Sequence, residues 1–258
     1  MGINPSQDLN GFIDQWNKAG EQYKADYSQL LTMIQQMLAL AKKGEVGEAF
    51  QMGQMVVMPG AMQVQGDSMA KLAASMNIAS ALEEFTTEAQ KDMNGIAGGP
   101  KNQDPTQQGD AFVKYIKEFY NEINTLPPPP WLNADTKASL DAAISKICES
   151  VDCTGVNDPN FNGKYVGGMI AYWANNPNTT DNQNGMSNPG GKTGQQCLQA
   201  LQAGFTQWNN TESAQSQVLQ SQEQFQSNIF NQYMNTCTDI FQASQKQAQM
   251  MVQNQKTQ

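Results

Sequence analysis

Paired carboxylates are the residues whose spacing comes closest to known catalytic chemistry. They occur at Glu83/Glu84, Glu118/Glu122 and Asp152/Asp158. Two carboxyl groups can act as general acid and general base, as they do in glycoside hydrolysis. Glu118 and Glu122 share a helix face with Lys114, which is typical of solvated ion pairs. Asp152 and Asp158 do not have the spacing of a calcium-binding loop. We therefore predict neither a catalytic residue nor a bound metal ion.

Two residue types on which many enzymes depend are missing. The sequence contains no His, and all 15 of its basic residues are Lys. Without His the chain cannot form a Ser–His–Asp or Cys–His catalytic site. Without Arg it has no guanidinium group to bind a phosphate through two parallel hydrogen bonds. Gly190-Gly191-Lys192-Thr193 matches the end of a phosphate loop, but Met186 stands where that loop needs its first Gly. We predict no cofactor and a protein that is not an enzyme. Carboxylate- or cysteine-based catalysis stays open.

The charge balance narrows the choice of partners. The 258 residues carry a formal net charge of −9, and neutral amides are abundant, with 34 Gln and 24 Asn. Binding to nucleic acid needs a positive patch, so we expect no nucleic-acid partner. The longest apolar run, around Met55–Met58, is far too short for a transmembrane segment. The first residues lack the basic start and apolar core of a cleavable signal peptide.

Four cysteines leave two interpretations open. Cys148, Cys153, Cys197 and Cys237 have no C-x-x-C spacing, so they do not indicate a zinc site. Cys148 could bond to Cys153 across a turn, and Cys197 could bond to Cys237 between helices. Alternatively, all four are small buried residues in a chain that stays reduced.

The N-terminal segment has a sustained apolar repeat. Apolar residues recur with steps of four and three, interrupted only at Gly20. A repeat of 3.5 residues places such side chains along one seam of a long helix, which then needs a helical partner. We predict an assembly interface along this seam at Leu9, Ile13, Trp16, Tyr23, Tyr27, Leu30, Ile34 and Met37.

The C-terminal segment has a second stripe. Apolar pairs recur every eleven residues from Val218/Leu219 onward, and no Pro or Gly interrupts residues 211–258. Eleven residues in three turns keep a stripe on one face of a nearly straight helix. We predict a helix over 211–252 that pairs antiparallel with the N-terminal helix. The predicted interface residues on this helix are Val218, Phe225, Ile229, Ile240 and Met251.

The remaining chain is predicted to consist of shorter helices and loops. Helices are expected over 47–58, ending at Pro59, and over 67–94, within a methionine-rich stretch that is either core or a partner surface. No run alternates as a strand does. The predicted fold is all-α, an elongated helical bundle built on a long antiparallel coiled coil with shorter helices inserted. The expected domains are residues 1–43 (coiled-coil helix), 44–174 (inserted helices), 175–194 (flexible linker) and 195–258 (coiled-coil helices).

This layout resembles the hydrophilic translocators, needle-tip and filament proteins of bacterial type III secretion. The matching segments are Leu9–Ala41, Asp67–Asn94 and Thr211–Gln258. The resemblance implies a non-enzymatic virulence protein, secreted without a cleavable signal peptide and located at the bacterial surface or in the host cell. Its implied partners are further copies of itself, a secretion chaperone, translocon proteins or a host protein. The alternative is a secreted effector that binds a host protein or a membrane-associated complex.

Overall fold

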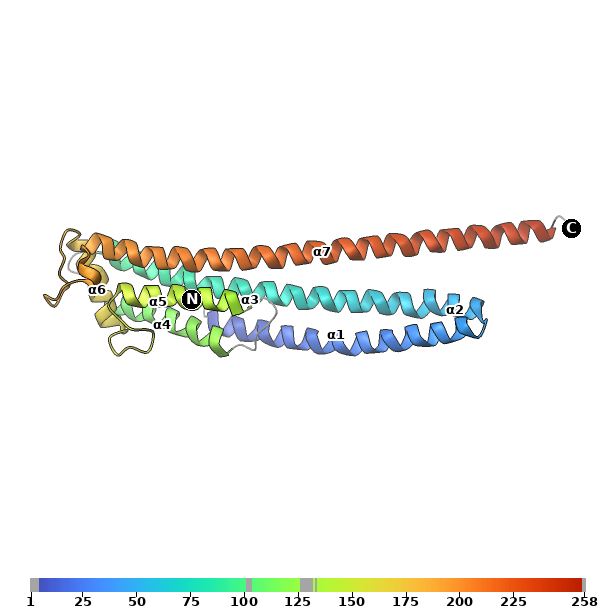
Figure 1. The fold of residues 1–258 in the computed structure, drawn as a ribbon, viewed down its shortest axis with the longest axis horizontal. Helices are drawn as coiled ribbons and strands as arrows, with labels where there is room; N and C mark the ends of the chain where they lie inside the picture. The colour runs from blue at the N-terminus through green and yellow to red at the C-terminus, as the bar shows by residue number, and fades with distance from the viewer. Residues whose placement is uncertain (1–4, 101–103, 126–131, 133, 257–258) are drawn as a thin grey trace. The chain divides into compact units, whose positions relative to one another are not determined.

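The computed structural model describes residues 5–100, 104–125, 132 and 134–256, with side chains described from residue 9 to 232 and at 235 and 239 within these ranges. The all-α prediction is confirmed, since the described residues form helices joined by loops and contain no strand, only an isolated bridge between Asp181 and Ser187 (Figure 1). The helices are α1 (Pro5–Lys42), α2 (Val46–Met52), the π-helix η1 (Gly53–Val57), α3 (Met58–Gly98), α4 (Thr106–Thr125), α5 (Ala134–Ser150), α6 (Gly163–Asn175), the short 3-10 helix η2 (Pro189–Gly191) and α7 (Gly194–Lys256).

Two compact units divide the chain. Unit 1 comprises Met1–Phe12 and Ser75–Val218, and unit 2 comprises Ile13–Ala74 and Leu219–Gln258. This division crosses three helices, α1, α3 and α7, each of which contributes one part to each unit. The division therefore follows packing rather than the element boundaries on which the expected domains were based.

Unit 1 is built around aromatic side chains. The rings of Phe119 and Trp208 lie 4.3 Å apart between centroids, and Phe205 stacks on Trp208 at 5.9 Å. Phe85 and Phe112 extend the cluster with edge-on contacts. All five side chains are fully buried. These residues come from α3, α4 and α7, and burying such large apolar surfaces is the main force that holds those helix segments together.

Helices α4 and α6 approach each other through glycines. A Cβ atom placed on Gly109 would collide with the backbone carbonyl of Gly163 and come within 3.0 Å of the Gly167 Cα atom. Only residues without a side chain allow two helix backbones to pass this closely. The Gly109–Gly163 crossing brings the apolar faces of both helices into the core of unit 1.

The stretch 175–194, predicted to be a flexible linker, carries a connected set of hydrogen bonds in unit 1. The Asn188 side chain accepts a hydrogen bond from Trp173 Nε1 at 2.7 Å and donates to the backbone oxygens of Thr179 and Lys192. Asn182 Oδ1 accepts from two backbone N–H groups of the loop. The buried Asn side chains thus form hydrogen bonds with backbone groups of the loop. The polar composition of the loop alone does not reveal this role.

Helix boundaries differ from the predictions at two places. Helix α3 follows η1 directly, with helical backbone angles at Met58, so Pro59 lies within a continuous helical stretch rather than after the end of a helix. Proline has no N–H to donate to the preceding turn, and that turn is the π-helix η1 rather than regular α-helix. Helix α7 begins at Gly194, so the long helix predicted to begin at residue 211 begins 17 residues earlier.

In unit 2, α1 packs on η1 and α3. A Cβ atom on Gly60 would lie 3.4 Å from the Leu30 side chain, and one on Gly53 would lie 3.2 Å from Met37 Sδ. On α3, Gln65 and Ser68 form hydrogen bonds to Gln226 of α7. Helix α3 thus contacts both long terminal helices in this unit. The direct antiparallel pairing of the first and last helices stays a prediction.

Candidate functional site

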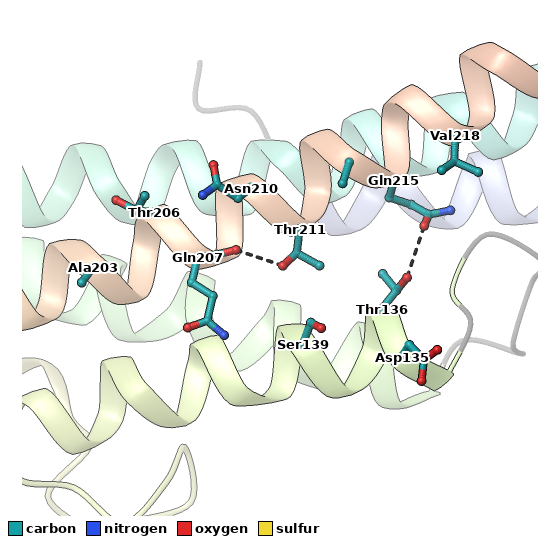
Figure 2. A pocket seen from close by; sticks show the side chains of 11 residues that line it. Asp135, Thr136, Ser139, Ala203, Thr206, Gln207, Asn210, Thr211, Gln215 and Val218 are labelled. Atoms are coloured by element: carbon teal, nitrogen blue, oxygen red, sulfur yellow. Dashed lines mark hydrogen bonds between the residues drawn. The ribbon is translucent and has the colours of Figure 1, made fainter.

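A groove lies between α5 and α7 in unit 1. Its volume is about 670 Å³. Figure 2 shows α7 lining one side of it with a full helix face and the N-terminal half of α5 lining the other. The residues along α7 recur at steps of three and four because one face of a helix repeats that way. They are Ala203, Thr206, Gln207, Asn210, Thr211, Ala214, Gln215 and Val218.

The chemistry of the groove is neutral. Its lining consists mainly of small residues, hydroxyls and side-chain amides, and Asp135 is its one ionisable residue. Thr136 Oγ1 donates a hydrogen bond to Gln215 Oε1 at 3.3 Å, which links α5 to α7 at one end of the groove (Figure 2). Amides and hydroxyls can both donate and accept hydrogen bonds. Several of these groups are already used within the protein, since the Thr206 and Thr211 hydroxyls donate to backbone carbonyls of α7. The lining therefore offers a mixed apolar and polar surface, and it contains no arrangement for acid–base or nucleophilic chemistry.

A buried carboxyl group lies in the same unit, close to this groove. Glu212 is 7 % exposed, and its two oxygens accept hydrogen bonds from Trp208 Nε1 and Thr86 Oγ1, both at 2.8 Å. Burial raises the pKa of the Glu212 carboxyl well above its usual range, because the charged form loses its hydrating water. The cavity beside it has a volume of about 20 Å³, which is room for one water molecule and not for a substrate.

Sequence analysis missed Glu212, although the sequence carries a signal for it. The residue continues the apolar stripe of Leu201, Phe205 and Trp208 at helical spacing. A charged residue on an apolar stripe is expected to be buried and hydrogen-bonded.

The carboxylates singled out by sequence do not come together as a site. Lys114 pairs with Glu118 at 3.8 Å, as the spacing suggested, and the Glu118 side chain is only partly exposed. Asp158 accepts hydrogen bonds from the backbone of Thr154 and Asn160, which lower the pKa of its carboxyl. Within the described ranges, no group of three or more His, Cys, Asp or Glu is arranged to hold a metal ion.

The described cysteines are free and buried. Cys148, Cys153 and Cys197 form no disulfide in the structure, and the Cys237 side chain lies outside the described residues. Burial, together with smaller contributions from nearby acidic groups, raises the pKa of the Cys148 and Cys153 thiols to about 12. These two residues are therefore neutral thiols at physiological pH, which makes them poor nucleophiles.

The predicted assembly residues on α1 differ in their exposure. Leu9 in unit 1 is fully buried and Leu30 in unit 2 is nearly so, whereas Tyr27 is 44 % exposed. The others have intermediate exposure: Ile13, Trp16, Tyr23, Ile34 and Met37. Leu31 and Leu38, which the heptad analysis left out, are exposed on the same helix face as Tyr27. The sequence pattern therefore predicted a helix with an apolar face. It did not predict which of the apolar residues are exposed to solvent.

The predicted assembly residues on α7 are the more exposed set. Phe225 is 66 % exposed and Ile229 is 47 % exposed, one helical turn apart in unit 2. Val218, in unit 1, is also exposed. The side chains of Ile240 and Met251 lie outside the described residues.

Comparisons with known proteins give no relative. No family model, no curated protein and no solved structure matches the chain. No helix in the part of the chain that the structure describes is long and apolar enough to cross a membrane.

Proposed function

We propose that this chain is a non-enzymatic secreted interaction protein that assembles through the outer faces of its long helices, as a tip, filament or translocator-like component of type III secretion would. One observation carries the proposal. Large apolar side chains lie exposed at helical spacing on α1 (Tyr27, Leu31, Leu38) and on α7 (Phe225, Ile229) in unit 2. Apolar faces of this kind are a common feature of protein–protein interaction sites.

The charge pattern of the C-terminal segment supports binding to further copies of the chain. Residues 213–258 contain two acidic residues, Glu223 and Asp239, and two basic residues, Lys246 and Lys256. This segment is neutral within a chain of net charge −9. Two such segments can therefore approach without the long-range repulsion that the rest of the protein would produce.

Light scattering across a concentration series tests the proposal. We expect the protein to form oligomers or filaments as its concentration rises. Ile229→Asp and Leu31→Asp should reduce this association, since each places a charge within an apolar face. The matched controls are Gln224→Asp and Gln36→Asp, which add the same charge at exposed positions on other faces of the same helices. A monomer at all concentrations, or equal effects of test and control variants, would contradict assembly through these faces.

The second candidate is an effector that binds a host protein or a membrane-associated complex, and the neutral groove of unit 1 favours it. Its amides and hydroxyls are suited to a polar helix or loop of a partner. Asn210→Lys and Ala214→Lys would then abolish the capture of one defined host protein while the oligomeric state stays unchanged. Loss of self-association in these groove variants would argue against a separate effector surface.

A further inference from the structure

Helix α5 ends in a Schellman motif that contains two cysteines. The backbone N–H of Cys153 donates a hydrogen bond to the Cys148 carbonyl at 3.0 Å. Inside this bond, the N–H of Asp152 donates to the Glu149 carbonyl at 3.1 Å, and Asp152 has a left-handed backbone conformation with φ of 60°. Two nested hydrogen bonds and one left-handed residue are the features that define this type of helix C-terminus.

The motif limits how far apart the two cysteines can lie. Standard backbone bond lengths and a hydrogen bond of 3.0 Å keep the Cα atoms of Cys148 and Cys153 less than about 7 Å apart. Disulfides join residues whose Cα atoms are about 4.4–6.8 Å apart. In a Schellman motif the side chains at these two positions also commonly contact each other. The backbone of the helix end is therefore compatible with a bond between the two sulfur atoms.

Both cysteine side chains are turned into unit 1. Cys148 is 0 % exposed and Cys153 is 3 % exposed. The Cys153 thiol donates a hydrogen bond to the Val151 carbonyl at 3.6 Å, so its sulfur atom is directed back toward the end of α5. Burial, and after it the neighbouring Cys153, raise the pKa of Cys148 to about 12, which agrees with this placement.

The chain that follows the motif is also held in place. The Asp158 carboxylate accepts hydrogen bonds from the backbone N–H and the hydroxyl of Thr154, at 2.8 Å and 2.9 Å. It also accepts one from the backbone N–H of Asn160. Cys153 is thus fixed by the helix on one side and by this turn on the other. Two reacting groups that are held together in this way react as if they were at high concentration.

We propose that the Schellman motif aligns Cys148 and Cys153 as a disulfide site, at which a low-molecular-weight disulfide such as oxidised glutathione converts the two thiols into an intrachain bond that holds the end of α5 to the following turn. The site depends on the geometry of this helix end alone. It does not rest on the proposed assembly function.

The reaction consists of two thiol–disulfide exchanges. One cysteine loses its proton, and its sulfur attacks the glutathione disulfide, so that one glutathione leaves as a thiolate and takes up a proton. The second cysteine then loses its proton and attacks the mixed disulfide, which releases the other glutathione. The two cysteine thiols together lose two electrons and two protons, and the glutathione disulfide gains them.

Burial determines when this exchange takes place. A mixed disulfide with glutathione has no room at two side chains that are 0 % and 3 % exposed, and neutral thiols attack slowly. The bond therefore forms while the chain folds or when the end of α5 opens. A chain that folds under reducing conditions keeps both thiols free, which is the state that the structure describes.

Refolding of the full chain from urea in a glutathione redox buffer tests the site. Trypsin cleaves after Lys146 and Lys164, so both cysteines lie on the peptide 147–164, and a bond between them prevents alkylation of that peptide. We expect this bond to be the predominant one. Its equilibrium constant against glutathione should be about tenfold or more larger in the folded chain than in urea, because the bond and the fold stabilise each other. An equal or smaller constant in the folded chain, or pairing of either residue with Cys197, would overturn the proposal.

Two variants at Asp152 test whether the motif aligns the pair. Asp152→Val places a β-branched residue in a left-handed conformation that it rarely adopts, so we expect it to lower the equilibrium constant of the folded chain. Asp152→Gly is the matched control, because it removes the same charge and adopts this conformation readily. Equal constants in the two variants would show that the short sequence separation alone brings the thiols together, which contradicts alignment by the motif. The measurement on the unaltered protein stands even if Asp152→Val folds poorly.

Discussion

Unit 1 and unit 2 bury their large apolar side chains to very different extents. The largest fully buried side chains, which include Trp173, Trp208 and Phe161, all belong to unit 1. Of the large apolar side chains that are exposed in the described chain, only Met186 and Val218 belong to unit 1, and the rest lie in unit 2. Unit 1 thus has a densely packed apolar core, while unit 2 leaves more of its large apolar side chains exposed.

The buried polar groups do not separate the two units in the same way. In unit 1, Glu212 and Asn188 are buried and hydrogen-bonded, but Asp141 Oδ1 is buried without a hydrogen-bond partner among the described residues. In unit 2, Gln65 and Ser68 form hydrogen bonds to Gln226. The contrast between the units therefore lies in their apolar side chains.

The largest expected effect is the loss of an aromatic ring from unit 1. Phe119→Ala should lower the free energy of unfolding by about 3–5 kcal/mol, because it leaves a cavity beside Trp208 and Phe85. Phe225→Ala in unit 2, where the ring is 66 % exposed, should change it by less than about 0.5 kcal/mol. Urea unfolding measures both values. Similar losses in the two variants would remove the distinction between the units.

A smaller effect is expected at the close crossing of α4 and α6. Gly109→Ala should destabilise unit 1 by about 2–3 kcal/mol, since the added methyl group would collide with the Gly163 carbonyl. Gly155→Ala is the control, because nothing lies within 4 Å of the position that its Cβ atom would take. Thermal unfolding followed by circular dichroism compares the two variants. Equal unfolding temperatures would show that the crossing is looser than the structure indicates.

Glu212 predicts a pH dependence for unit 1. Because the pKa of its carboxyl is raised in the folded state, its contribution to stability is full below the ordinary value, 4.5, and decreases as the pH rises toward the folded value. Glu212→Gln should weaken this decrease while keeping an acceptor for Trp208 or Thr86. Glu212→Leu should cost about 1–3 kcal/mol, because both donors lose their acceptor. Unfolding curves recorded between pH 4 and 8 give the free energy of unfolding of each variant and distinguish these outcomes. If this free energy changes with pH in Glu212→Gln as it does in the unaltered protein, the pH dependence comes from other groups.

The smallest expected signal is the reactivity of the buried thiols in unit 1. Cys148 and Cys153 should resist alkylation by iodoacetamide at pH 8 in the folded protein, since both stay protonated and buried. Mass spectrometry of the labelled peptides gives the rate for each cysteine, with the urea-unfolded protein as the fully reactive reference. Rapid labelling of either residue in the folded state would show that unit 1 opens readily around it.

Much of the fold could be predicted from the sequence. Apolar residues at steps of three and four predicted the long helices, and the absence of alternating runs predicted that no strand would form. Phe112, Ile116 and Phe119 recur in the sequence at helical spacing, and they are buried on one face of α4 in unit 1. Local patterns suffice here because a helix forms its backbone hydrogen bonds within its own segment.

The partners of these helices were decided by tertiary packing. The heptad pattern of Leu30 and Met37 demands a partner helix without specifying which one, and in unit 2 the contacts of these residues are with α3 and η1. The sequence also contained Glu212 as an ordinary acidic residue, which the packing of α7 on α3 buries beside Thr86. Whether a carboxyl group lies in water or inside an aromatic core depends on long-range packing. The sequence by itself therefore determined the helices, and only the tertiary structure decided which faces are buried and which stay exposed.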